Sequence, residues 1–236
     1  MNDTLEMEKA FIQEVKKHFT MVYTRGNNDE ELYELIDLLH IEHHKKYLDL
    51  GTGSGYVAFQ MADRFPYAII EGLDIVEEMR IRNQNEAKTK GLSNVSFLKY
   101  DGITFPVEDD CYDGIITRYS LHHFPNIERT ASEMDRVLKT KSTIVICDCI
   151  PTKDDHVRFI DSWMRVLGDG HVSFRTVEEY QKVLGKYNFK LKQHIQKHIL
   201  CPRENSDIYR RLLNEHKREA DSYHYHIDGK TIWLDE

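Results

Sequence analysis

Short apolar runs alternate with longer polar segments through the middle of the chain. The apolar runs have the length of strands, and they cover residues 47–50, 68–73, 95–99, 112–117 and 143–148. The segments at 56–64, 77–90 and 126–138 have the length and the apolar spacing of helices. Strands that alternate with helices predict βαβ units and a mainly parallel sheet with right-handed crossovers.

The two ends of the chain depart from this rhythm. Before residue 40 the apolar positions Phe11, Val15, Phe19 and Val22 recur at the three- to four-residue spacing of helices. No linker divides the chain, so we expect one domain over 1–236, with an N-terminal helical cap (1–40), a core (41–150) and a C-terminal cap region (151–236).

The C-terminal region predicts a mixture of elements. Helical patterns at 153–167 and 176–185 precede a strand-like segment at 189–200, and a polar helix is expected at 205–221. Asp228 and Gly229 stand between two apolar segments and form a hairpin turn signal. None of these patterns indicates a second independent core.

A glycine-rich turn follows the first predicted strand and leads into a helix. It contains Gly51, Gly53 and Gly55, and Asp49 stands two residues before the first glycine. Glycines there allow a ligand to approach the backbone closely, next to the amide groups of a helix start. The third glycine of the dinucleotide-binding pattern is replaced by Tyr56. The acid before the loop favours a cationic ligand over a pyrophosphate.

Two further acids stand at the ends of predicted strands. Asp74 ends the second strand, and Asp101 ends the third. In doubly wound sheets an acid after the second strand accepts hydrogen bonds from ribose hydroxyls. Each acid also suits the cap of the helix that follows its strand. Together with the glycine loop, the three carboxylates predict a nucleotide-type ligand in the crevice at the carboxyl ends of the strands.

These motifs resemble the class I S-adenosylmethionine-dependent methyltransferases over roughly residues 45–150. Residues 48–55 (LDLGTGSG) resemble the first motif of that family, and residues 72–75 (GLDI) resemble the acidic turn after it. Residues 101–113 and the RVLK segment at 136–139 resemble two later motifs, although Thr140-Lys141-Ser142 replaces the usual Pro-Gly-Gly turn. The resemblance implies an α/β fold, with a doubly wound, mostly parallel, seven-stranded Rossmann-like sheet.

The resemblance also implies which residues bind S-adenosylmethionine and its product S-adenosylhomocysteine. Asp49 and the glycines Gly51, Gly53 and Gly55 would face the methionine part, and Asp74 would bind the ribose. Asp101 would accept from the adenine amine, Ile75 would contact the adenine ring, and Gly102 would allow its close approach. Arg118, at the end of the fourth strand, would lie beside the cofactor.

The acceptor side depends on histidines. Residues 117–125 (TRYSLHHFP) lack the Asn-Pro-Pro-Tyr type of signature found in nucleic-acid methylases, and they resemble the small-molecule branch that includes the ubiquinone and menaquinone biosynthetic enzymes. His122, His123 and, from a second motif at 169–175, His171 are candidates to line the acceptor pocket. A histidine near its ordinary pKa is suited to remove a proton from a hydroxyl or an enolisable carbon.

Composition narrows the function classes. The net charge of −8 argues against a general nucleic-acid binder, although residues 181–220 carry ten Lys/Arg against four Asp/Glu. No apolar run is long enough to span a membrane, and four cysteines and the absence of a secretory signal indicate a cytoplasmic protein. No complete metal-ligand set is present, so no metal is expected.

We therefore expect a methyltransferase acting on a small-molecule acceptor, without a membrane span. Three alternatives stay open: an RNA methyltransferase that uses the basic 181–220 segment, a non-catalytic methyltransferase-like binding module, and an NAD-dependent oxidoreductase. The sequence also leaves open a homodimer and the identity of the acceptor atom.

Overall fold

The computed structural model describes residues 5–7, 9–13, 29–197 and 200–235. The chain divides into two compact units, Met1–Asp148 and Cys149–Glu236, and each is described here by itself. The expectation that they act as one domain stays a prediction. The N-terminal residues Val15, Phe19 and Val22, on which part of the first predicted helix depends, lie outside the described residues.

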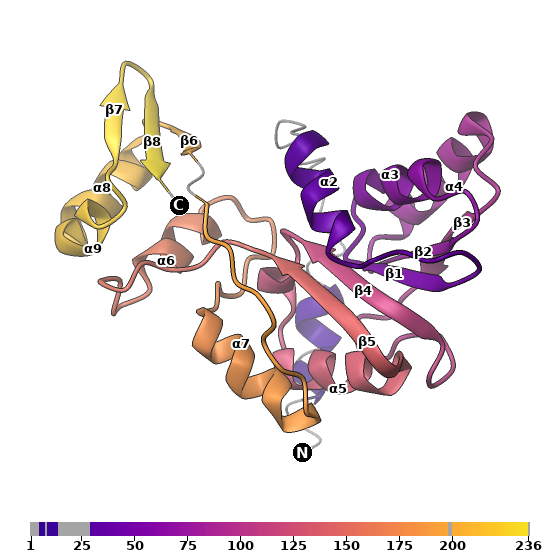
Figure 1. The fold of residues 1–236 in the computed structure, drawn as a ribbon. Helices are drawn as coiled ribbons and strands as arrows, with labels where there is room; N and C mark the ends of the chain where they lie inside the picture. Colours follow the sequence, from indigo (N-terminus) through magenta and orange to yellow (C-terminus); the bar gives the residue numbers. More distant parts are fainter. Residues whose placement is uncertain (1–4, 8, 14–28, 198–199, 236) are drawn as a thin grey trace. The chain divides into compact units, whose positions relative to one another are not determined.

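The first unit is built on a sheet of five parallel strands (Figure 1). Their order is β3-β2-β1-β4-β5, and all four neighbouring pairs are parallel. The strand order reverses between β1 and β4, and in open α/β sheets ligands bind at the carboxyl ends of the strands beside such a point. The strands are β1 (Lys46–Leu50), β2 (Ile69–Asp74), β3 (Val95–Lys99), β4 (Tyr112–Arg118) and β5 (Leu138–Cys147).

Helices cover both faces of this sheet. Figure 1 shows α2, α3 and α4 on one face and α5 on the other. On the first face, buried residues such as Ile36 of α2 and Met61 of α3 join Ile70 and Phe97 of the strands in one apolar cluster. The helices are α2 (Asp29–Asp37), α3 (Tyr56–Arg64), α4 (Glu77–Lys90) and α5 (Ile127–Val137), and a 3-10 turn, η1 (Leu121–His123), lies between β4 and α5.

The predicted strands of the core are confirmed, and β5 starts earlier than the pattern indicated. The sequence predicted a helix to residue 138 and a strand from 143. In the structure α5 passes directly into β5, which begins at Leu138 opposite Tyr112. The register shifts between Tyr112 and Gly114, and Lys141 has a φ of 71°. Residues 140–142 (Thr-Lys-Ser) therefore belong to the irregular first part of β5 and do not form a separate turn.

The second unit combines helices with a small antiparallel sheet. The sheet has the order β6-β8-β7, and Asp228 of β7 pairs with Thr231 of β8, as the hairpin signal predicted. Ile232 and Leu234 of β8 are fully buried, together with Trp163 of α6. The elements are α6 (Phe159–Arg165), α7 (Val177–Leu184), η2 (Gly185–Tyr187), β6 (Leu200–Glu204), α8 (Asp207–Glu215), α9 (Lys217–Asp221), β7 (His226–Asp228) and β8 (Thr231–Asp235).

The strand expected at 189–200 does not form over residues 189–197, which have no regular structure. The segment alternates lysines with apolar residues, and Leu191 and Ile195 are both more than half exposed. It therefore has no buried face that would hold it against a sheet. Within the described residues the parallel sheet has five strands, and the expected seven-stranded sheet is not confirmed. No helix in the described part of the chain is long and apolar enough to cross a membrane.

The apolar cluster under α2 gives a test of the first unit. Ile36 of α2 is 0% exposed, whereas Ile81 of α4 is 49% exposed. We expect Ile36→Ala to lower the free energy of unfolding by about 2–5 kcal/mol, because it leaves a cavity in a closed cluster. Ile81→Ala should change it by less than about 0.5 kcal/mol. Urea unfolding followed by circular dichroism measures both, and equal effects would contradict the assigned core.

Candidate cofactor and acceptor site

The glycine loop joins β1 to α3 in a conformation that needs glycine. Gly51, Gly53 and Gly55 have φ angles of 71°, 49° and 79°, which side-chain-bearing residues rarely adopt. A Cβ at Gly51 would lie 1.7 Å from Oγ of Ser120, and a Cβ at Gly55 would lie 2.7 Å from the ring of Phe59. A Cβ at Gly53 would meet no atom of the described residues within 4 Å. The loop is thus closely packed at both ends and open at its middle glycine.

Backbone and amide hydrogen bonds hold the loop in place. The N–H groups of Gly51 and Thr52 both donate to the carbonyl of Leu73 in β2, over 2.8 and 3.0 Å. Nδ2 of Asn83, from α4, donates to the carbonyl of Gly53 over 2.8 Å. The loop is therefore fastened to the second strand and to the helix that follows it.

Asp49 is buried beneath the loop. Its Oδ2 accepts hydrogen bonds from Oγ1 of Thr52 (2.6 Å) and from the N–H of Ala58 in α3 (3.1 Å). Burial raises the pKa of Asp49 to about 7, against the opposing effect of these two hydrogen bonds; the charge of Asp74 raises it further, and Arg118 lowers it. Asp49 therefore shapes the turn from strand to helix, and its charge changes near neutral pH.

Asp74 lies at the end of β2 and braces the same loop. Its Oδ2 accepts from the N–H of Gly53 over 2.8 Å, and its Oδ1 accepts from the N–H of Val76 over 2.9 Å. Burial raises the pKa of Asp74, and these backbone hydrogen bonds act in the opposite direction. The side chain and the neighbouring Ile75 are both partly exposed. The structure thus brings two of the three predicted acids, Asp49 and Asp74, to one loop.

The third predicted acid belongs to a different local arrangement. Asp101 is exposed, and its Oδ1 accepts from the N–H groups of Ile103 (2.7 Å) and Thr104 (2.9 Å). Gly102 has a φ of 95°, and a Cβ there would lie 2.7 Å from Cδ1 of Ile12 in the helical residues 9–13. The side chain of Ile12 therefore lies against Gly102, at the position where the adenine ring was expected.

Arg118 ends β4 next to the exit of the glycine loop. Its guanidinium lies 4.8 Å from the ring centre of Tyr119 and 5.9 Å from that of Tyr56, the first residue of α3. Both distances allow cation–π attraction. Tyr119 has a φ of 50°, uncommon for an aromatic residue, which marks a sharp change of chain direction after β4. Arg118 thus contacts the first residue of α3, and its predicted place beside the cofactor stays a prediction.

The same turn presents the two adjacent histidines. Nδ1 of His122 lies 2.6 Å from Oδ1 of Asp148, and the backbone N–H of His122 donates to Oδ2 of Asp148 over 3.0 Å. The side chains of both residues are almost completely buried. The rings of His122 and His123 lie 4.1 Å apart at 51°. His122 is therefore fixed at its ring and at its backbone by a single carboxylate.

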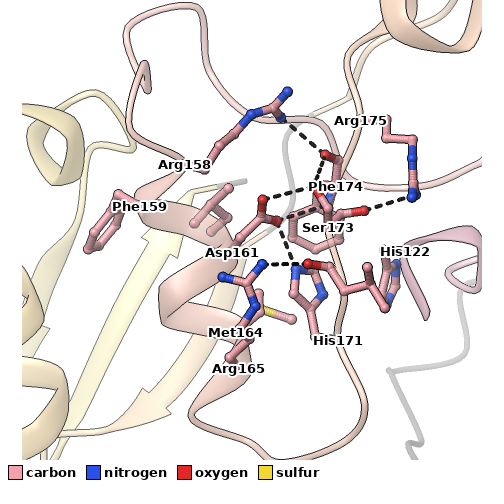
Figure 2. Close-up of polar contacts among 12 residues, drawn as sticks. His122, Arg158, Phe159, Asp161, Met164, Arg165, His171, Ser173, Phe174 and Arg175 are labelled. Carbon is pink, nitrogen blue, oxygen red and sulfur yellow. Dashed lines mark hydrogen bonds and ion pairs between the residues drawn. The ribbon is translucent and has the colours of Figure 1, made fainter. Parts of the chain in front are cut away.

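His171 lies in the second unit and is fully buried. Figure 2 shows the carboxylate of Asp161, from α6, surrounded by its hydrogen-bond donors. Nε2 of His171 lies 2.8 Å from Asp161, whose carboxylate also accepts from Oγ of Ser173 (3.0 Å) and from the N–H of Phe174 (2.8 Å). Although burial acts to raise it, the pKa of Asp161 is lowered by these hydrogen bonds, the one from His171 foremost. In this structure His171 fastens the 168–175 loop, and its assignment to the acceptor site stays a prediction.

Several residues of the site were missed by the sequence reasoning. Asp148 directly follows Cys147, the last residue of β5. An acid at the end of a predicted strand could have been recognised from the sequence as a candidate site residue. Ser120 gave no such signal, because a hydroxyl that contacts the loop from another strand cannot be recognised from its neighbours in sequence. Thr52 lies within the loop, and its bond to Asp49 was not predicted from the loop's spacing. Within the described residues no group of three His, Cys, Asp or Glu side chains is arranged to hold a metal ion.

A parallel sheet with a glycine loop after β1 and an acid at the end of β2 defines the nucleotide-cofactor class of α/β folds. The profile described as "Methyltransferase domain" matches residues 41–216. The chain therefore belongs to the methyltransferase domain family, and it resembles the class I S-adenosylmethionine-dependent methyltransferases of the menaquinone type.

Two similar proteins illustrate the relationship. The uncharacterized methyltransferase YcgJ of Bacillus subtilis is 28% identical over 169 residues, which is 71% of this chain and 66% of YcgJ. The crystal structure of YcgJ has a TM-score of 0.72 at 23% identity, covering 88% of this chain and 95% of that one. The demethylmenaquinone methyltransferase of Thermus thermophilus is 30% identical over 107 residues, 45% of this chain and 48% of that enzyme. The chain thus spans only about half to two-thirds of these relatives' sequences.

One further solved structure with a similar fold contains S-adenosyl-L-methionine. It is phosphoethanolamine N-methyltransferase 2 of Haemonchus contortus in complex with S-adenosyl-L-methionine, with a TM-score of 0.61 at 15% identity. The superposition covers 90% of this chain and 47% of the Haemonchus contortus chain, and it shows that the two folds are alike.

The buried carboxylate of Asp49 predicts how stability depends on pH. The pKa of Asp49 is about 7 in the folded protein, above the ordinary value of 3.8. Between pH 3.8 and pH 7 the folded state therefore binds more protons than the unfolded state does. The protonated Asp49 carboxyl group therefore adds to the free energy of unfolding; this contribution is fully present below about pH 4 and is lost as the pH rises through 7. Asp49→Asn keeps an oxygen for both hydrogen bonds and does not titrate. Urea unfolding at pH 6 and pH 8 should show the unaltered protein losing roughly 1 kcal/mol more than the variant; a parallel loss in both would contradict the assignment.

Proposed function

We propose that this protein transfers the methyl group of S-adenosylmethionine to a small-molecule acceptor, with His122 as the general base. The observation that carries the proposal is the position of the His122–Asp148 pair. Ser120, two residues before His122, lies against Gly51 of the cofactor loop. The candidate base and the candidate cofactor loop therefore lie on two turns of the first unit that contact each other.

The residues around the loop fit the proposed cofactor. The outer side of Gly53 is open, so a ligand has room to approach the backbone there. Asp74 is partly exposed and sits where ribose hydroxyls are bound in such folds. The carboxylate of Asp49 and the guanidinium of Arg118 offer one charge of each sign, which matches the ammonium and carboxylate groups of a methionine moiety. When bound, S-adenosylmethionine supplies a methyl group on a sulfonium whose departure leaves the neutral S-adenosylhomocysteine.

His122 is suited to take a proton from the acceptor. The carboxylate of Asp148 can only accept at Nδ1, so Nδ1 of the neutral imidazole carries the proton and Nε2 is the basic nitrogen. An acceptor hydroxyl or enolisable carbon would give its proton to Nε2 as it attacks the methyl carbon. Asp148 keeps the imidazole in this tautomer and stabilises the imidazolium that results. Because the pair is buried, the ring is held in one orientation, which favours a near-attack geometry.

The other interpretations have less support. A dinucleotide-binding oxidoreductase would need a third glycine where Tyr56 stands, and the buried acid Asp49 would repel a pyrophosphate. An RNA methyltransferase is disfavoured by the net charge of −8. The relatives named demethylmenaquinone methyltransferase support a small-molecule acceptor. A non-catalytic binding module would have no use for an oriented histidine beside the loop.

Cofactor binding gives the first test of this proposal. Asp74→Ala removes the carboxylate that would bind the ribose, and we expect it to weaken S-adenosylmethionine binding by about 10- to 150-fold, equivalent to about 1.5–3 kcal/mol. Asp135→Ala, which changes an exposed acid of α5, is the matched control and should bind as the unaltered protein does. Isothermal titration calorimetry measures both, with circular dichroism to confirm that each variant is folded. Binding of NAD without binding of S-adenosylmethionine would refute the cofactor.

Turnover tests the acceptor side. The acceptor is first found by screening metabolite extracts for transfer of a labelled methyl group from S-adenosylmethionine. His122→Ala should then lower kcat on the order of 10²-fold while cofactor affinity stays within a factor of about three, because a general base acts on the acceptor alone. His123→Ala and His171→Ala should have smaller effects.

The control for this test is His43→Ala, which changes an exposed histidine at the other end of the sheet and should retain full activity. Asp148→Asn should lower kcat without a comparable change in KM, since an amide no longer enforces the tautomer. If His123→Ala is the variant that loses activity while His122→Ala retains it, the base is His123.

A further inference from the structure

Arg203 of β6 is a buried cation in the second unit. Only 6% of the residue is exposed, while its neighbours Pro202 and Glu204 are exposed. It pairs across the small sheet with Ile232, which is fully buried, as is Leu234 further along the same strand. Because side chains alternate along a strand, Arg203 lies on the inward, apolar face of the sheet.

The guanidinium of Arg203 makes few polar contacts. Nη1 donates to the carbonyl of the preceding Pro202 over 2.8 Å, and Nη2 lies 3.0 Å from Sδ of Met164 in α6. Nε has no hydrogen-bond partner among the residues that the structure describes. A guanidinium has five N–H donors, so one carbonyl and one weakly accepting sulfur leave most of them unsatisfied. Within the described residues no carboxylate pairs with it.

Two partly buried arginines, Arg136 and Arg158, are paired with carboxylates. Arg136 bonds with Glu133 and Asp109, and Arg158 bonds with Glu179, although both are more exposed than Arg203. The more deeply an arginine is buried, the more it needs an anion, because the loss of hydration costs several kcal/mol. Arg203 has the greatest need of the three and lacks the partner that the others have in the described residues.

A second buried donor lies in the same small core. Nε1 of Trp163 is buried and has no hydrogen-bond partner in the described part of the chain. Trp163 is the chain neighbour of Met164, which touches Arg203. Its ring lies 4.4 Å from that of Tyr209 in α8. Among the described residues, the core of the second unit thus holds a cation without a carboxylate and an indole N–H without an acceptor, surrounded by apolar and aromatic side chains.

We propose that Arg203 binds the carboxylate of an apolar small molecule. A carboxylate matches the planar fork of a guanidinium with two parallel hydrogen bonds, and its single charge balances the single charge present. Met164 and Ile232, which lie beside Arg203, favour an apolar body next to the carboxylate. The residues of this site belong to the second unit, and the proposal does not depend on the proposed methyl transfer.

Nuclear magnetic resonance titration tests this proposal, with sodium benzoate as the probe. The chain has two tryptophans, so the indole N–H region holds two signals, and Trp233→Phe assigns them. We expect benzoate to shift the Trp163 indole signal and the Arg203 Nε–H signal in a saturable way. Acetate and phosphate should bind at least about tenfold more weakly, acetate for lack of an apolar body and phosphate for its shape and second charge. Sodium chloride at equal ionic strength should produce no saturable shift.

Two variants separate a specific site from general attraction. Arg203→Met should lower the benzoate affinity by at least about tenfold, whereas Arg211→Met, which changes an exposed arginine of α8, should leave it unchanged. A saturable shift that persists in Arg203→Met, or an unaltered protein that shows none with benzoate, would overturn the site. Tighter binding of phosphate than of benzoate would show that the ligand is not a carboxylate. The titration of the unaltered protein decides the proposal even if Arg203→Met does not fold.

Discussion

The geometry of the first unit depends on one buried carboxylate at the end of β1. Asp49 receives the hydroxyl of Thr52 from within the glycine loop and the backbone N–H of Ala58 from the first turn of α3. These two bonds fix how the chain leaves the strand, crosses the loop and enters the helix. The position of Gly53 and its contact with Asp74 follow from that path. A change at Asp49 would therefore move the whole cofactor side of the site, and not only one ligand contact.

The turn after β4 uses the same arrangement with a different acid. Asp148, at the end of β5, holds both the backbone and the ring of His122, as Asp49 holds both the loop and the helix. Asp49 holds the chain that follows its own strand, β1, whereas Asp148 holds the chain that follows the neighbouring strand, β4. These two strands lie on the two sides of the point where the strand order reverses. Parallel strands bring their carboxyl ends to one edge, so these two anchored turns meet there through Ser120 and Gly51.

The sequence predicted the parts of the fold that have strong local patterns. The strand 95–99 and the helices 56–64 and 77–90 were predicted at their observed bounds. In these segments the apolar pattern begins or ends beside a glycine or an acidic residue. The segment 189–200 was predicted as a strand, but residues 189–197 have no regular structure, because strand formation also needs a partner edge and a buried face. The glycine loop and Asp49 were readable because their spacing is local. The pairing of His122 with Asp148, and of His171 with Asp161, joins residues 26 and 10 positions apart, and no local pattern encodes such contacts.

The two units show two ways in which a folded protein accommodates a buried charge. Asp49 can become neutral, and burial moves its pKa to about 7, so the charge can be lost where the surroundings do not support it. An arginine keeps its proton under all ordinary conditions, so Arg203 has no such route. It must gain an anion, or the second unit must bear the full desolvation penalty of the guanidinium. A chain of marginal stability tolerates such a penalty poorly. The burial of Arg203 without a carboxylate among the described residues is therefore easier to explain by a bound anion than by packing alone.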